Sequence, residues 1–137
     1  MKLSLAKKGL LLTFFLSVIS CVNTEDNIIG DFSSHLIPGN GFHNMLYQQQ
    51  FIFSNKGVKA FGNNNDFIIL KTCAIKDNHL NRDSVFYYII DIHGYAKDPN
   101  QEKSKALYGP LNENEFSLKK KQLGINSMIF KEEYNDN

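Results

Sequence analysis

The sequence predicts an α+β domain, in which an antiparallel β-meander of five or six strands is followed by one C-terminal α-helix at about residues 113–123. Two observations carry this prediction. Between residues 28 and 92, short apolar and aromatic runs are separated by clusters of Gly, Asn, Asp and Pro, a pattern typical of antiparallel strands and tight turns. Residues 112–124 then carry the start and stop signals of a helix.

The expected strands are the runs between these turns. Pro38-Gly39-Asn40-Gly41 is the strongest turn signal, because Gly and Asn adopt positive φ at low cost. The run 67–75 is the most apolar and is β-branched on both faces, which places it centrally in the sheet beside 85–92. Residues 94–105 are polar, contain Pro99, and are expected to form a loop. The full set of expected strands is 32–37, 42–53, 58–61, 67–75, 85–92, a short strand at 106–108 and an edge strand at 127–130.

The helix prediction depends on its two ends. Asn112 is a good N-cap residue, and Glu115 three positions later completes a capping box. Gly124 supplies the stop, since glycine readily adopts the left-handed conformation that ends a helix. Lysines 119–121 fall in the last turn, where positive charge complements the helix dipole. The lysine run therefore has a structural explanation that needs no nucleic acid.

The first 20 residues form a predicted signal peptide. Residues 1–8 are short and basic, and residues 9–20 are apolar, as in a secretory leader. This apolar stretch is shorter than the roughly 20 residues that a transmembrane helix needs. The leader ends in Val18-Ile19-Ser20-Cys21, which resembles the lipobox of bacterial lipoproteins, although Ile19 is bulkier than the usual small residue and Val18 replaces the usual Leu.

This resemblance implies that Cys21 is lipidated. A diacylglycerol would be added to the thiol of Cys21, cleavage would make this residue the N-terminus, and an acyl group such as palmitate would follow. Two or three acyl chains make a stable anchor, whereas one chain does not. We therefore expect an extracytoplasmic protein anchored to the cell membrane or outer membrane. An ordinary cleaved signal and an uncleaved anchor remain the alternatives.

The expected organisation is a signal peptide at 1–20, a lipidated tether at 21–27, a single α+β domain at 28–130 and a flexible tail at 131–137. Removing the three leader lysines from the fifteen basic residues leaves twelve against fourteen acidic ones, a formal charge of −2. Such a near-neutral domain lacks the basic patch by which proteins bind nucleic acid. With Cys21 acylated, Cys73 has no disulfide partner and is expected to be a small buried apolar residue.

No catalytic, cofactor-binding or metal-binding residue is predicted. The sequence contains no GxSxG, P-loop or CxxC motif. Asp91 and His93 are two residues apart on an expected strand and could share one face, and His35 and His43 flank an expected turn. For both pairs, ordinary surface or strand-end positions are the simpler interpretation. Five tyrosines could instead form a partner surface, with burial against the sheet as the alternative: Tyr47, Tyr87, Tyr88, Tyr95 and Tyr108.

Residues 30–123 also resemble small uncharacterised bacterial lipoproteins. The resemblance is carried by Pro38-Gly39-Asn40, by Phe86-Tyr87-Tyr88-Ile89-Ile90-Asp91, and by Tyr108-Gly109-Pro110-Leu111 followed by Glu115-Phe116. It implies a domain of unknown function and no catalytic residue. The leading hypothesis is a non-enzymatic envelope lipoprotein that binds an envelope protein or a cell-wall partner. The alternatives are an immunity protein or hydrolase inhibitor that inserts residues 94–105 into a partner, and a membrane-tethered enzyme.

Overall fold

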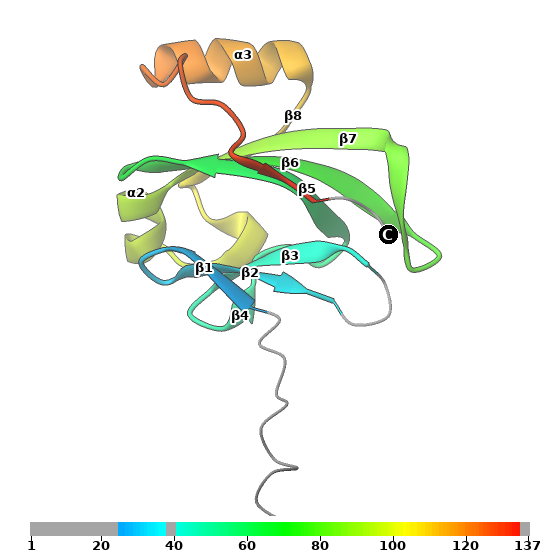
Figure 1. Ribbon diagram of the computed structural model, residues 1–137. Coiled ribbons are helices and arrows are strands. Elements are labelled where there is room, and N and C mark those ends of the chain that lie inside the picture. The colour runs from blue at the N-terminus through cyan, green and yellow to red at the C-terminus, as the bar shows by residue number, and fades with distance from the viewer. Residues whose placement is uncertain (1–24, 38–40, 135–137) are drawn as a thin grey trace, which may run out of the picture.

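The computed structural model describes residues 25–37 and 41–134, which form one antiparallel sheet of nine strands with short helices (Figure 1). The main path of the sheet follows the order β1-β2-β3-β5-β6-β7-β8, so the predicted meander is confirmed, but the number of strands was underestimated. Two further strands lie off this path, β4 beside β3 and β9 beside β5. The strands are β1 (Glu25–Ile29), β2 (Phe32–Leu36), β3 (His43–Tyr47), β4 (Gln50–Phe51), β5 (Lys56–Asn63), β6 (Phe67–Lys76), β7 (His79–Asp91), β8 (Leu107–Leu111) and β9 (Glu132–Glu133).

The sheet is folded into two layers, because β3 and β5 are joined by a single residue pair, His43 with Val58. Figure 1 shows β1–β4 in the lower layer and β5–β8 in the upper one, with α2 (Ile92–Lys97) and the 3₁₀ helix η1 (Gln101–Lys103) between the layers at one side. Helix α3 (Glu113–Gln122) covers the outer face of the upper layer. The upper layer of the sheet therefore has one face enclosed between the layers and the other face covered by α3.

Strands β6 and β7 form the centre of the upper layer, as predicted from their apolar runs. Their side chains alternate between two cores, as the two-residue period of a strand requires. Ile68 and Ile90 face the core between the layers, whereas Ile69 and Ile89 face the core beneath α3. All four are fully buried, which explains why these strands are apolar on both faces.

Two predicted boundaries differ from the structure. The expected strand 42–53 is split, because Gln48 and Gln49 adopt φ of 47° and 67° and turn the chain between β3 and β4. Residues 25–27 of the expected tether belong to β1, which starts at Glu25 and pairs with β2, and the Ser33 hydroxyl donates a 2.6 Å hydrogen bond to the Glu25 carboxylate. Residues 21–24, with Cys21 and the predicted leader, lie outside the described residues.

The C-terminal segment also differs from its prediction. Residues 127–130 form no strand, and the short β9 lies instead in the predicted tail, paired with Ala60 and Phe61 of β5. Tyr134 is buried because its ring stacks on His43, with ring centres 3.5 Å apart, and its carbonyl oxygen accepts a hydrogen bond from the Lys59 ammonium. The tail is therefore part of the domain at least as far as Tyr134. Residues 135–137 lie outside the described part of the chain.

The predicted helix is confirmed as α3, and its capping box is present. The Asn112 side chain accepts a hydrogen bond from the Glu115 amide at 2.9 Å, and the Glu115 carboxylate accepts one from the Asn112 amide at 2.8 Å. The lysine run has structural contacts at the other end of the helix. The Lys120 ammonium donates to the Met128 carbonyl, and the Lys119 ammonium lies 4.3 Å from the centre of the Tyr108 ring.

Replacing Asn112 with alanine is expected to lower the free energy of unfolding by about 1 kcal/mol, because the first turn of α3 loses its side-chain acceptor. Urea denaturation measures this change. Asn114→Ala, at an exposed position inside the same helix, is the matched control. An equal loss in both variants would show that the cap contributes nothing of its own.

Residues 94–105 were predicted to be a loop, and this is wrong for most of the segment. Residues 94–97 belong to α2 and residues 101–103 form η1, and Tyr95 and Ser104 are buried. The Asp91 carboxylate caps α2 by accepting a 3.0 Å hydrogen bond from the Gly94 amide. In the described part of the chain, no helix has the length and apolar character needed to cross a membrane.

Candidate functional site

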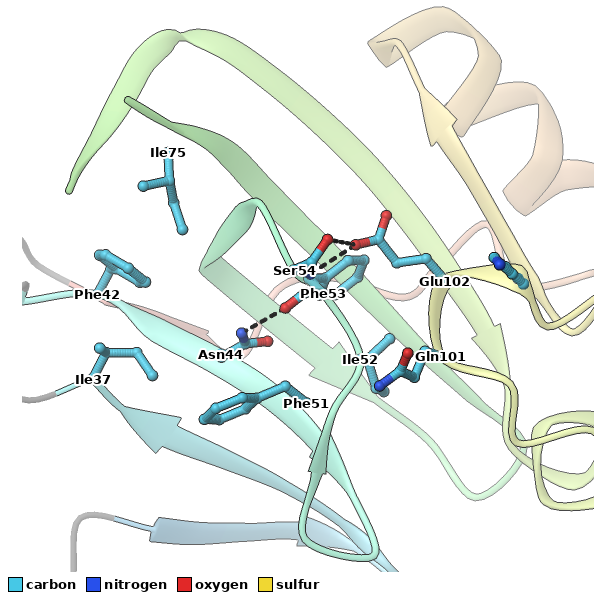
Figure 2. A pocket seen from close by; sticks show the side chains of 11 residues that line it. Ile37, Phe42, Asn44, Phe51, Ile52, Phe53, Ser54, Ile75, Gln101 and Glu102 are labelled. Atoms are coloured by element: carbon cyan, nitrogen blue, oxygen red, sulfur yellow. Dashed lines mark hydrogen bonds between the residues drawn. The ribbon is translucent and has the colours of Figure 1, made fainter. Parts of the chain in front are cut away.

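A cleft of about 680 Å³ lies where the two layers meet (Figure 2). Its size falls in the range of about 300–1,000 Å³ that is usual for small-molecule sites. The walls come from the β2–β3 hairpin, from the segment that follows β4, from the end of β6, and from η1. The lining residues are Ile37, Phe42, Asn44, Phe51, Ile52, Phe53, Ser54, Ile75, Gln101, Glu102 and Lys103.

Most of the cleft wall is apolar. Ile52 and Phe53 are buried and belong to the core between the layers, so the inner wall is continuous with that core. Phe51 is 44% exposed, which makes it one of only three large apolar side chains of the described residues that are exposed. Its ring centre lies 6.1 Å from that of His35 on β2. Phe51 therefore forms an accessible apolar lip beside a largely buried apolar wall.

Two of the charged or amide side chains in the wall, Glu102 and Asn44, bond to neighbouring parts of the protein. One Glu102 carboxylate oxygen accepts hydrogen bonds from the Ser54 amide at 2.9 Å and the Ser54 hydroxyl at 3.4 Å (Figure 2). The other oxygen pairs with the Lys56 ammonium at 3.2 Å. The Asn44 side chain donates to the Phe53 carbonyl at 2.9 Å and accepts from the Met45 amide at 2.8 Å. These bonds hold the wall in shape.

The Lys56 side chain lies beside this wall, between the Glu102 carboxylate and the Tyr88 ring. Its ammonium is 5.8 Å from the centre of the Tyr88 ring, and the buried Tyr88 hydroxyl has no hydrogen-bond partner among the described residues. Burial lowers the pKa of Lys56, but the nearby Tyr88 hydroxyl and Glu102 carboxylate outweigh this effect, so the pKa is raised overall. Burial raises the pKa of Tyr88, which keeps its hydroxyl protonated. Lys56 therefore remains a cation and balances Glu102.

Helix η1 is held in place by Tyr95 of α2. The Tyr95 hydroxyl donates a 3.2 Å hydrogen bond to the Gln101 carbonyl, and its ring packs against Phe32 and Tyr47 at centre distances of 5.5 and 5.2 Å. Burial, with smaller effects from Tyr47 and Asp98, raises the pKa of Tyr95 to about 12. Gln101 has a φ of 49°, which is unfavourable for a residue other than glycine. Gln101 has this positive φ as the first residue of η1, where its side chain lines the cleft.

The structure does not bring the predicted residue pairs into the cleft. Asp91 ends β7, whereas His93 lies in α2, so the two do not share a strand face as predicted. The exposed His93 ring lies 3.1 Å from the Asp66 carboxylate instead. His35 and His43 lie on the paired strands β2 and β3, but they are not directly opposite, since His35 faces Asn44 and Leu36 faces His43.

Within residues 25–37 and 41–134, no group of three or more His, Cys, Asp or Glu side chains could hold a metal ion. Cys73 is buried in β6, as expected for a small apolar residue. Of the five tyrosines, Tyr47, Tyr88 and Tyr95 are buried in the core between the layers, and Tyr87 and Tyr108 are partly buried against the core beneath α3, as the burial alternative expects.

His43 links the C-terminal segment to β3. Its ring is nearly parallel to that of Tyr134, with an angle of 5° between the planes, and its buried Nδ1 has no hydrogen-bond partner among the described residues. Burial lowers the pKa of His43, Asp26 opposes this shift, and His35 adds to it. The folded protein therefore favours the neutral imidazole.

We expect the free energy of unfolding to fall as the pH is lowered below about 6.5, the ordinary pKa of histidine. The unfolded chain takes up a proton there, whereas folded His43, with its lowered pKa, does so only at lower pH. The loss therefore develops from pH 6.5 down to the folded-state pKa. Urea denaturation across this range should show a smaller loss in His43→Phe than in wild type, and no change in the exposed control His79→Asn. The same pH slope in all three proteins would contradict this role of His43.

The sequence did not reveal the cleft. Its lining comes from four separate segments, and none of them carries a motif for ligand binding. The available clue was Asp91 three residues before Gly94, the spacing of an N-cap, which marks the start of α2.

Comparison with known proteins places the chain in a family of unknown function. The searches of curated proteins and of solved structures returned no match. Residues 31–134 match the model of a family described as a protein of unknown function, DUF3997. This match covers all strands from β2 to β9, α3 and every residue that lines the cleft. The chain therefore belongs to the DUF3997 family.

Proposed function

We propose that the protein is a non-enzymatic binding module of the cell envelope, anchored to a membrane by lipid on Cys21, and that the cleft is its binding site. The lipobox-like Val18-Ile19-Ser20-Cys21 supports the anchor. The cleft supports the binding role, because it combines an accessible apolar lip at Phe51 with a buried apolar wall. Apolar clefts of this size with few polar groups are typical of ligand sites.

The polar groups in the wall favour binding over catalysis. The Glu102 carboxylate is engaged by Ser54 and Lys56, and the Asn44 amide is engaged by backbone groups of β3 and the following segment. Groups used in this way maintain the shape of the site, whereas a general acid or base must reach the substrate. The cleft thus offers a partner mainly shape and apolar surface.

The immunity-protein or inhibitor alternative depended on residues 94–105 as an exposed inserting loop. Tyr95 anchors this segment in the core, Ser104 is buried, and residues 101–103 form part of the cleft wall. No observation favours the tethered enzyme.

Photo-crosslinking at the lip tests this proposal. A benzophenone amino acid replaces Phe51 in the full chain, expressed with its leader, and irradiation follows in intact membranes. The matched control carries the same group at Leu118, which is 57% exposed on α3. We expect a discrete adduct at position 51 and none at 118, with the captured partner identified by mass. Absence of an adduct at 51, or the same adduct at both positions, would refute the cleft as the binding site.

A further inference from the structure

We infer that the cleft accepts an acyl chain of a lipid from the membrane to which the protein is anchored. This inference rests on the proposed function and names the ligand class of the same site. Three observations carry it: the position of the cleft relative to Cys21, the exposed lip, and the hydrogen bonds that already engage three backbone groups of the inner wall.

The cleft lies close to the point where the anchor joins the domain. Glu25, the first residue of β1, pairs with His35 of β2, which pairs with Asn44 of β3, a residue that lines the cleft. Neighbouring strands are about 4.8 Å apart, so Asn44 is about 10 Å from Glu25 across the sheet. Cys21 precedes Glu25 by four residues, which span at most about 14 Å. The cleft is thus held near the membrane surface.

The side chains at this end of the domain suit contact with lipid. Ile37, Phe42 and Phe51 lie at the β2–β3 hairpin and on β4, around the part of the cleft nearest to β1 (Figure 2). Phe51 is exposed although it is a large apolar residue. Phe42 is buried and Ile37 is half-buried, so Phe51 is the exposed entry to an apolar wall, and the hydrocarbon interior of the membrane is the apolar environment nearest to an anchored protein.

The inner wall is unsuited to an extended peptide. A peptide that adds to a sheet needs a row of free backbone donors and acceptors. Here the Ile52 amide donates to the Met45 carbonyl, the Phe53 carbonyl accepts from Asn44, and the Ser54 amide donates to Glu102. An acyl chain needs no such bonds and gains free energy simply by covering the apolar wall. These observations favour a lipid chain over a peptide.

Labelling with a lipid probe tests the inference. The full chain, purified from membranes in its processed form, is reconstituted into phosphatidylglycerol vesicles that contain a phospholipid with a diazirine on one acyl chain. Irradiation and peptide mass spectrometry then locate the label. We expect it on the peptides that carry residues 51–54 and Ile75, in the cleft wall.

Three variants make the test specific. Phe51→Asp places a charge at the lip, and Ile75→Trp fills the cleft; each should reduce labelling of the cleft peptides about tenfold. Ile129→Asp replaces an apolar side chain that is 76% exposed outside the cleft, and its labelling should equal that of wild type. Circular dichroism checks that each variant folds. If Ile75→Trp does not fold, Phe51→Asp still tests the inference, because Phe51 is exposed and its replacement leaves the core unchanged.

The outcomes separate this inference from the proposed function. Flotation with the vesicles, measured first, reports the anchor independently of the cleft, and failure to float would refute the proposed function. A floating protein with an unlabelled cleft overturns the inference alone, including the case in which the acyl groups on Cys21 themselves fill the cleft. Capture of a protein by the benzophenone at position 51 likewise overturns the lipid ligand and leaves the binding module intact.

Discussion

Replacing Tyr95 with alanine is expected to lower the free energy of unfolding by about 3–5 kcal/mol, the usual cost of removing a large buried aromatic side chain. Tyr95 is 1% exposed and packs against Phe32 and Tyr47, which belong to the lower layer. Since a domain of this size is stable by only about 5–15 kcal/mol, this single change should remove much of its stability. Urea denaturation followed by circular dichroism measures the loss.

Tyr95→Phe is the matched control. It keeps the ring contacts and removes only the hydrogen bond to the Gln101 carbonyl, so it should cost about 1 kcal/mol. It should also reduce the loss of stability at high pH. The unfolded chain ionises tyrosine near pH 10, whereas folded Tyr95 has a pKa of about 12, so the contribution of Tyr95 is lost as the pH rises between these values. Equal stability of the alanine and phenylalanine variants would show that the ring does not hold η1 and α2 in the core.

Replacing Cys21 with serine is expected to abolish incorporation of labelled palmitate into the protein. Serine has no thiol to receive the diacylglycerol, and processing of a lipoprotein leader follows this step. The variant should therefore accumulate as a precursor that retains the 20 residues before Cys21. Metabolic labelling and gel electrophoresis of the membrane fraction measure both effects.

Cys73→Ala is the control for this experiment, because it removes the other cysteine of the chain from a buried position in β6. It should leave palmitate incorporation and processing unchanged. Incorporation that survives in Cys21→Ser, or that is lost only in Cys73→Ala, would contradict lipidation at Cys21.

Local sequence signals predicted the elements whose stability is local. The capping pair Asn112 and Glu115 predicted α3, and the β-branched run 67–75 predicted the central strand β6. The cap joins residues that are close in sequence, and the apolar run reflects the burial of a single strand on both of its faces. Such patterns are visible without knowledge of the tertiary structure.

Elements that depend on distant partners were missed. Strand β1 begins with the polar residues Glu25, Asp26 and Asn27, and it forms because β2 provides its hydrogen bonds. Strand β9 has only two residues and depends on β5. The turn at Gln48 and Gln49 uses positive φ at residues that rarely adopt it, so no turn signal marked it.

The candidate site could not be predicted for a related reason. Its wall is assembled by the single β3–β5 pair that folds the sheet and by η1, which Tyr95 holds through the Gln101 carbonyl. Asp91 and His93 were predicted to share a face because β7 was expected to continue to residue 92, whereas the strand ends at Asp91 and α2 follows. Where a strand ends thus decided which side chains could meet.

The mass of the mature N-terminal peptide tests the membrane anchor most directly. Protein extracted from membranes is digested, and the N-terminal peptide is measured by mass spectrometry. We predict that this peptide starts at Cys21 and carries a diacylglycerol on sulfur, with a further acyl group on the amino terminus. A peptide that starts at an unmodified residue, or one that still contains the leader, would contradict the membrane-anchored function and the lipid ligand inferred from it.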